Sequence, residues 1–160
     1  EMTSSLVGSE MCKETGIIRN LLTHEITHLL IGHRYPAADA ALESTDYLTR
    51  LDAYTFHEGF AHLLSYQATE IDCVDWHTPQ LTEVAAASRA KLRLALTETD
   101  PDRQKQFLEE AVCGSYYEKF ACMCGMLYLA DRWETQGIDG LQSAFADYHG
   151  FAQRALSIRI

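Results

Sequence analysis

A pair of histidines lies inside an apolar helical pattern near the start of the chain. His24 and His28 are one helical turn apart, and apolar residues recur around them between Gly16 and Gly32. The apolar series is Ile17, Ile18, Leu21, Leu22, Ile26, Leu29 and Leu30. This spacing predicts a buried helix of about four turns. Both histidines would project from one face of that helix, where burial without polar partners is unfavourable. A bound metal ion would satisfy them.

Glu25 follows His24 and completes the pattern His-Glu-x-x-His, which is the arrangement of zinc hydrolases. Zinc binds neutral imidazole nitrogens, and hydrolysis requires a carboxylate beside the zinc-bound water to accept its proton. We therefore predict His24 and His28 as metal ligands and Glu25 as general base. The alternative is that these three polar side chains merely share a solvated helix face.

A second stretch, residues 54–62, has the pattern of another helix and carries Glu58 within the sequence Glu-Gly-Phe-Ala. A catalytic zinc site takes three protein ligands and leaves the fourth position for water, so Glu58 can be the third ligand. HExxH followed by this element resembles the gluzincin zinc metallopeptidases, which include thermolysin-like and aminopeptidase-N-like enzymes. The resemblance covers about residues 17–66.

The resemblance implies that His24, His28 and Glu58 bind one zinc ion per chain and that Glu25 activates the zinc-bound water. The chain departs from the better-known gluzincins at two positions. His57 replaces an asparagine of the aminopeptidases, and their Gly-Ala-Met-Glu-Asn element is also missing. His62 replaces an aspartate that orients a zinc ligand in thermolysin-like enzymes. The hydrogen-bond acceptor that orients the zinc-binding histidines, their outer partner, must then come from elsewhere. Three acidic residues are unranked candidates: Asp46, Asp52 and Glu118.

His33 competes with Glu58 for the role of third ligand. If the helix continued, His33 would lie about 140° round from His28 and point away from the metal. The metzincin pattern also fails, because its glycine and histidine positions hold Ile31 and Arg34. We expect His33 at the helix C-terminus, where an imidazole suits the helix dipole.

Stabilising the transition state requires a further hydrogen-bond donor, commonly a tyrosine or histidine in gluzincins. The tyrosine candidates are Tyr54, Tyr66, Tyr116 and Tyr117, and the histidine candidates are His57, His62, His77 and His149. Each of these rings can equally be a packing residue with its polar atom at the edge of the core.

Helix signals fill the rest of the chain. Proline follows a capping residue at Thr78-Pro79 and Asp100-Pro101, which predicts helices running to about residues 96 and 112. Ser115 and Glu118 form a capping box that predicts a long helix over residues 116–136, closed by Gly137. A final helix is expected over residues 139–156.

The predicted fold is mainly α, a zincin-like helical domain with little or no β-sheet, and residues 1–160 form a single domain. Residues 120–130 are apolar on every side, which places their helix at the centre, with Gly125 permitting close approach of a neighbour. Zincins have a sheet beside the HExxH helix; here it is either missing or reduced to residues 4–11. The opening Glu1-Met2-Thr3 is compatible with a fragment of a longer chain.

Composition and charge disfavour several classes of partner. A net charge of −10 among 160 residues disfavours nucleic-acid and anionic-membrane partners. No apolar run reaches the roughly 20 residues of a membrane span. Five cysteines without CxxC spacing are expected to be free thiols, which favours a reducing, cytoplasmic location: Cys12, Cys73, Cys113, Cys122 and Cys124.

The sequence therefore predicts a zinc metallopeptidase acting on a peptide or protein substrate. The first alternative is a non-catalytic, zinc-stabilised helical interaction module. A more remote alternative is a di-iron carboxylate protein, because Glu25 and His28 also form a Glu-x-x-His element. Di-iron bundles need that element twice, whereas Glu58 and His62 are four residues apart rather than three.

Overall fold

The computed structural model describes the backbone of residues 4–159 and the side chains of residues 15–67 and 69–159. The mainly α prediction is confirmed, because these residues form helices and no strand. The α-helices are α1 (Ser4–Arg34), α2 (Pro36–Ala41), α3 (Tyr47–Ser65), α4 (Pro79–Thr97), α5 (Pro101–Val112), α6 (Phe120–Phe145) and α7 (Phe151–Ala155). Short 3₁₀ turns are η1 (Tyr66–Ala68), η2 (Ile71–Cys73) and η3 (Tyr116–Glu118).

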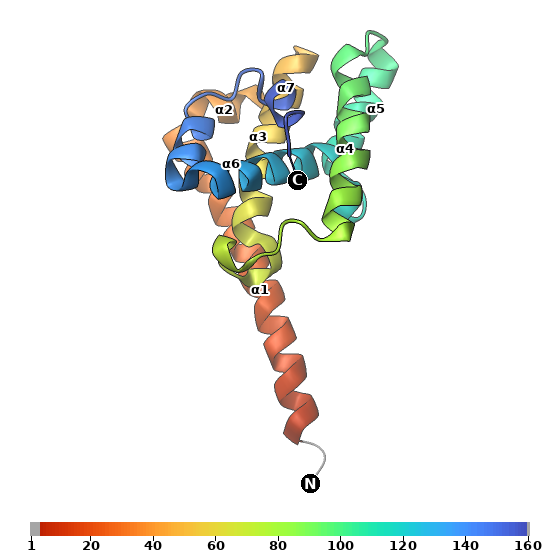
Figure 1. The fold of residues 1–160 in the computed structure, drawn as a ribbon. Helices are drawn as coiled ribbons and strands as arrows, with labels where there is room; N and C mark the ends of the chain where they lie inside the picture. The colour runs from red at the N-terminus through yellow and green to blue at the C-terminus, as the bar shows by residue number, and fades with distance from the viewer. Residues whose placement is uncertain (1–3, 160) are drawn as a thin grey trace.

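Helix α1 is a single rod whose N-terminal part extends away from the other helices (Figure 1). It begins at Ser4, so the expectation of a strand remnant over residues 4–11 is wrong. The helix ends at Arg34, and His33 lies in its last turn as predicted. The C-terminal part of α1 packs against α3, α2 and η1.

One side of α1 is exposed although we expected it to be buried. Its seven large apolar side chains are 50% to 72% exposed, and we call them the α1 apolar face: Ile17, Ile18, Leu21, Leu22, Ile26, Leu29 and Leu30. The side that packs inward instead carries Thr27 and Ile31, which are buried. The periodicity correctly indicated a helix, but the described residues include no element that covers its apolar face.

Helix α6 lies at the centre of the molecule, as predicted, and crosses α3 and α4 (Figure 1). Every residue from 120 to 130 is buried. The closest approach is at two glycines, since a Cβ atom added at Gly125 would lie 2.8 Å from the Cα atom of Gly59. Gly59 and Gly125 therefore allow α3 and α6 to approach closely.

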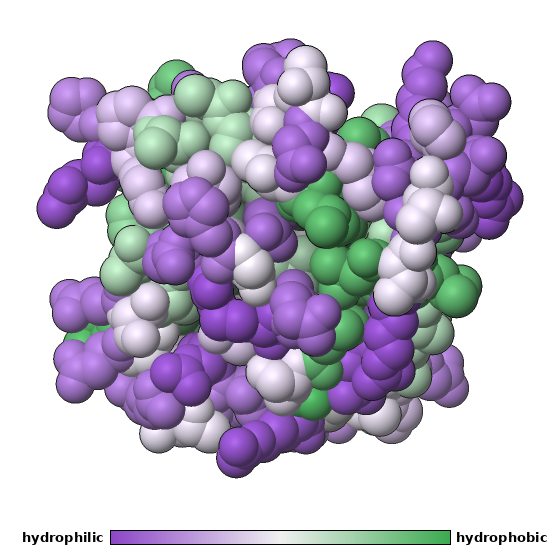
Figure 2. Space-filling model, turned by 90° about the horizontal axis from the view of Figure 1, so that it is seen from above, coloured by the Kyte–Doolittle hydropathy of each residue, from purple (hydrophilic) through white to green (hydrophobic). Residues whose placement is uncertain are grey.

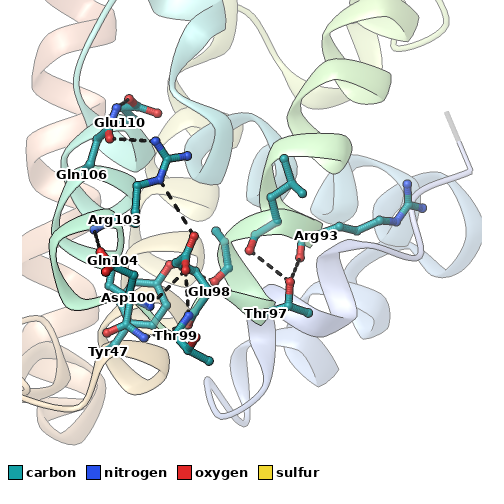
Figure 3. Close-up of polar contacts among 12 residues, drawn as sticks. Tyr47, Arg93, Thr97, Glu98, Thr99, Asp100, Arg103, Gln104, Gln106 and Glu110 are labelled. Atoms are coloured by element: carbon teal, nitrogen blue, oxygen red, sulfur yellow. Dashed lines mark hydrogen bonds and ion pairs between the residues drawn. The ribbon is translucent and has the colours of Figure 1, made fainter.

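The turn between α4 and α5 is held by Glu98 (Figure 3). Its Oε1 atom accepts hydrogen bonds from the backbone N–H groups of Thr99 and Asp100 at 2.9 and 3.0 Å. The Asp100 side chain in turn caps α5 by accepting from the N–H of Arg103. The two predicted Pro-initiated helices are confirmed, and their caps fix the α4–α5 hairpin that packs on α6.

The C-terminal third differs from the prediction in two places. The capping box of Ser115 and Glu118 is present, but it opens the 3₁₀ turn η3, and α6 begins at Phe120. Gly137 interrupts the regular helix, as the sequence predicted. It adopts φ 59° and ψ −142° within it, so the chain kinks and continues to Phe145 before the short α7. The predicted helix over residues 139–156 is therefore divided.

The surface seen from the end opposite the N-terminus is mostly hydrophilic, with a band of hydrophobic residues running across it (Figure 2). Within residues 4–159, no helix has the length and hydropathy that crossing a membrane requires. Four cysteines are free thiols, with Cys122 and Cys124 buried as expected but Cys73 and Cys113 exposed. Cys12 lies outside the described side chains.

Candidate metal centre

The candidate site forms where the middle of α3 packs against the C-terminal part of α1. Helix α3 begins at Tyr47, before the predicted helical stretch of residues 54–62, because the side chain of Asp46 accepts a hydrogen bond from the N–H of Thr49 and caps it. Glu58 then lies near the centre of the helix, with its side chain 21% exposed. Its carboxylate faces the two histidines of the HExxH motif.

The three residues predicted as ligands lie together. The Nε2 atoms of His24 and His28 are 3.0 Å apart. The Glu58 carboxylate contacts both rings, with Oε1 at 3.4 Å from His28 Nε2 and Oε2 at 3.6 Å from His24 Nε2. Glu58 is 30 or more positions away from both histidines in sequence, yet each of its carboxylate oxygens lies beside one of the two rings.

The spacing of these donor atoms is close to that of a small metal site. Zinc bonds of about 2.0–2.2 Å in a tetrahedron place neighbouring ligand atoms roughly 3.3–3.6 Å apart. The three observed separations are 3.0, 3.4 and 3.6 Å. The donor set of imidazole nitrogens and one carboxylate also matches the preference of zinc for nitrogen and oxygen ligands.

His62 lies beside the same carboxylate. Its Nδ1 atom is 2.9 Å from the backbone carbonyl oxygen of Glu58 and 3.3 Å from Oε2 of that residue. Its ring packs edge-on against His24, with centroids 4.8 Å apart. His24, Glu58 and His62 form a group that could hold a metal ion, with ligand atoms within 4.8 Å of one another.

The neighbours of His62 indicate its tautomer. Both oxygen atoms near Nδ1 can only accept hydrogen bonds, so Nδ1 carries the proton and donates to them. A protonated Nδ1 cannot also bind a metal through the same atom. His62 was expected to leave the site without an outer partner, yet it contacts the carboxylate of Glu58 directly.

Electrostatics keep Glu58 ionised. Burial alone would raise the pKa of its carboxyl group, but the hydrogen bond from His62 and the charges of His28, His62 and His24 lower the pKa to about 2. A carboxylate must be deprotonated to bind a metal, and Glu58 meets that condition at neutral pH.

Two histidines of the cluster have lowered pKa values, which favours their neutral forms. Burial, together with the charge of His62, lowers the pKa of His24. Burial and the charge of His28 lower the pKa of His57, which is 1% exposed and stacks on the His28 ring at 5.9 Å. Neutral imidazole is the form that binds metals. Burial therefore favours, at His24, the form that binds a metal.

Cys122 reaches the cluster from α6, and the sequence analysis did not assign it a role there. Its Sγ atom lies 3.6 Å from Oε2 of Glu58 and 3.5 Å from the carbonyl oxygen of Ala111. Burial raises the pKa of this thiol well above its usual value. One feature of the sequence could have predicted this position: Cys122 lies three residues before Gly125, so both residues are on the helix face that meets α3.

Glu25 lies at the edge of the cluster, on the solvent side of α1. It is exposed and borders a surface hollow of about 460 Å³, together with His28, His33 and Asp39. His33 is on the wall of this hollow and outside the group of possible metal ligands. The hollow gives a water molecule or a substrate access to the face of α1 that carries His28.

The three acidic outer-partner candidates are engaged elsewhere, so that prediction is wrong. Asp46 caps α3, and Glu118 belongs to the capping box of η3. Asp52 accepts hydrogen bonds from the backbone N–H groups of Gly150 and Ala152, at 2.6 and 2.9 Å, and joins α3 to the C-terminal segment.

Among the tyrosine candidates, Tyr116 has a ring contact with the cluster, its ring centroid lying 5.4 Å from that of His62. Tyr54 accepts hydrogen bonds from Arg50, and the hydroxyl groups of Tyr66 and Tyr117 are 3.3 Å apart. The other two histidine candidates pair with exposed carboxylates away from the site: His77 with Glu134 and His149 with Asp147.

Comparison with protein-family models, curated proteins and solved structures finds no match to this chain. The assignment of function therefore depends on the geometry of the site.

Proposed function

We propose that this protein is a zinc-dependent metallopeptidase in which His24, His28 and Glu58 hold one zinc ion. The observation that supports the proposal is the closeness of their donor atoms: the two Nε2 atoms are 3.0 Å apart, and the two oxygens of Glu58 lie 3.4 Å from that of His28 and 3.6 Å from that of His24. A bound zinc ion would supply Lewis acidity toward a water molecule and toward the scissile carbonyl group.

Glu25 is the general base in this proposal. It follows His24 directly, so its side chain projects about 100° round the helix from that ligand and borders the hollow beside His28. From there its carboxylate can accept the proton of the attacking water and later donate it to the leaving amine.

Tyr116 is the tyrosine best placed to donate a hydrogen bond to the oxyanion formed from the substrate carbonyl. It is the tyrosine candidate in ring contact with His62, and a phenol remains protonated at neutral pH. A preorganised donor of this kind contributes roughly 3 kcal/mol to transition-state stabilisation.

A non-catalytic, zinc-stabilised module is the second candidate, and two observations favour it. The α1 apolar face is exposed, as expected of a surface that binds a partner. His62 could also close the fourth coordination position, which is typical of structural zinc sites. The Nδ1 atom of His62 donates to Glu58 and so cannot bind the metal, which leaves the fourth position open and favours the catalytic arrangement.

The decisive experiment combines metal analysis with a search for hydrolysis. The purified protein should contain one zinc per chain, cleave members of a broad peptide library, and lose that activity on chelation. Tight zinc binding with no hydrolysis of any peptide would favour the structural module. Two irons per chain would support the di-iron alternative, and the absence of any bound metal would exclude all three functions.

A further inference from the structure

One oxygen atom of Glu58 has two hydrogen-bond donors from outside the predicted ligand set. Oε2 lies 3.3 Å from Nδ1 of His62 on α3 and 3.6 Å from Sγ of Cys122 on α6. Oε1 is the atom closest to His28. The two oxygens of this carboxylate therefore have different surroundings.

Both donors are held in place by the packing around them. His62 and Cys122 are 4% and 0% exposed, and His62 is further fixed by the bond from its Nδ1 to the Glu58 carbonyl oxygen. Cys122 is fixed by the crossing of α3 and α6, where Gly59 and Gly125 bring the two backbones together. Its thiol stays protonated in this buried setting and can donate.

We propose that Cys122 and His62 are positioning residues that hold Oε2 of Glu58 and thereby fix the orientation of its carboxylate toward the histidines of α1. The proposal deepens the function proposed above, because it concerns the same metal site. Hydrogen bonds to ligand carboxylates orient them, and losing such an outer partner typically weakens metal binding about 10–100-fold.

Zinc affinity of the full chain, measured by competition with a chromophoric chelator, is the first test. Cys122→Ala should weaken zinc binding about 10-fold, and Cys122→Ser, which keeps a donor, should recover part of the loss. Cys124→Ala is the matched control, because Cys124 is equally buried on the same helix and has no contact with Glu58. Equal effects of Cys122→Ala and Cys124→Ala would show that packing alone is responsible.

A double-mutant cycle separates positioning from direct binding. If Cys122 and His62 act through Glu58, then Cys122→Ala and His62→Phe should have little further effect on zinc affinity in a Glu58→Ala background. If His62 is itself a metal ligand, His62→Phe will weaken binding in that background as well. That result would overturn the role given to His62.

A readout independent of metal keeps the proposal testable if the protein binds no zinc. The S–H stretching band of Cys122 can be isolated as the infrared difference between wild type and Cys122→Ala. It should shift to higher frequency in Glu58→Ala, because a hydrogen bond to a carboxylate lowers it. An unchanged band would mean that the thiol donates only to the Ala111 carbonyl, and the proposal would be wrong even if the protein is a peptidase.

Discussion

Gly125 of α6 lies directly against Gly59 of α3. A Cβ atom added at Gly125 would be 2.1 Å from the carbonyl oxygen of Thr55 and 2.8 Å from the Cα atom of Gly59. The contact sets the distance between the two helices one residue away from Glu58. The packing of the core and the geometry of the candidate site therefore depend on the same crossing.

Gly125→Ala should destabilise the protein. The methyl group would meet backbone atoms, so the two helices must separate, and we expect the free energy of unfolding to fall by about 3 kcal/mol or more. Chemical denaturation measures this directly. The matched control is Gly32→Ala on α1, where an added Cβ meets only the side chain of Asp39. Its effect should stay within about 1 kcal/mol, because alanine favours the helix.

Glu58→Ala should weaken zinc binding by several orders of magnitude, because one of three proposed protein ligands is lost. His33→Ala should change the affinity little, since His33 lines the surface hollow and is not one of the proposed ligands. Titration of the metal-free protein with zinc measures both. Similar losses in the two variants would contradict the proposed ligand set.

Glu25→Gln should retain zinc and lose nearly all hydrolytic activity, since glutamine cannot accept the proton of the attacking water. The expected decrease in kcat is about 10²–10⁴-fold, the range typical of general acid–base catalysis. Activity assays must be paired with metal analysis of the same sample. If zinc is lost with the activity, Glu25 is a ligand rather than a base.

Polar substitution on the α1 apolar face should leave stability almost unchanged. Leu29 is 72% exposed, so Leu29→Gln is expected to alter the free energy of unfolding by less than about 0.5 kcal/mol. Leu127→Gln is the contrasting change, because Leu127 is fully buried and its replacement leaves an amide without partners. Thermal denaturation compares the stability of the two variants. If both are destabilised to a similar extent, Leu29 is covered in solution.

Local signals in the sequence predicted local structure well. Thr78-Pro79 and Asp100-Pro101 each open a helix, because the capping side chain and the proline act within one turn. The apolar run at residues 120–130 predicted the central helix, because a helix that is hydrophobic on all sides has to be enclosed. The predicted closeness of Gly125 to a neighbour followed from the same reasoning.

Features that depend on tertiary partners were not predictable. The pattern around Ile26 indicated an apolar helix face but carried no information about whether another element covers it. The sequence indicated the interruption at Gly137 but not the break between Phe145 and α7, which divides the predicted last helix. HExxH identified His24 and His28 as neighbours. Only the fold shows that Cys122 approaches Glu58, because 64 positions separate them.

The exposed apolar side of α1 also affects the thermodynamics of unfolding. Unfolding normally hydrates buried apolar groups, which raises the heat capacity by about 12–15 cal/mol/K per residue. The seven side chains of the α1 apolar face are already 50% to 72% exposed in the folded protein. Their hydration changes less on unfolding than that of buried side chains, so the heat-capacity increment should be smaller than the chain length suggests. The stability curve is correspondingly flatter with temperature.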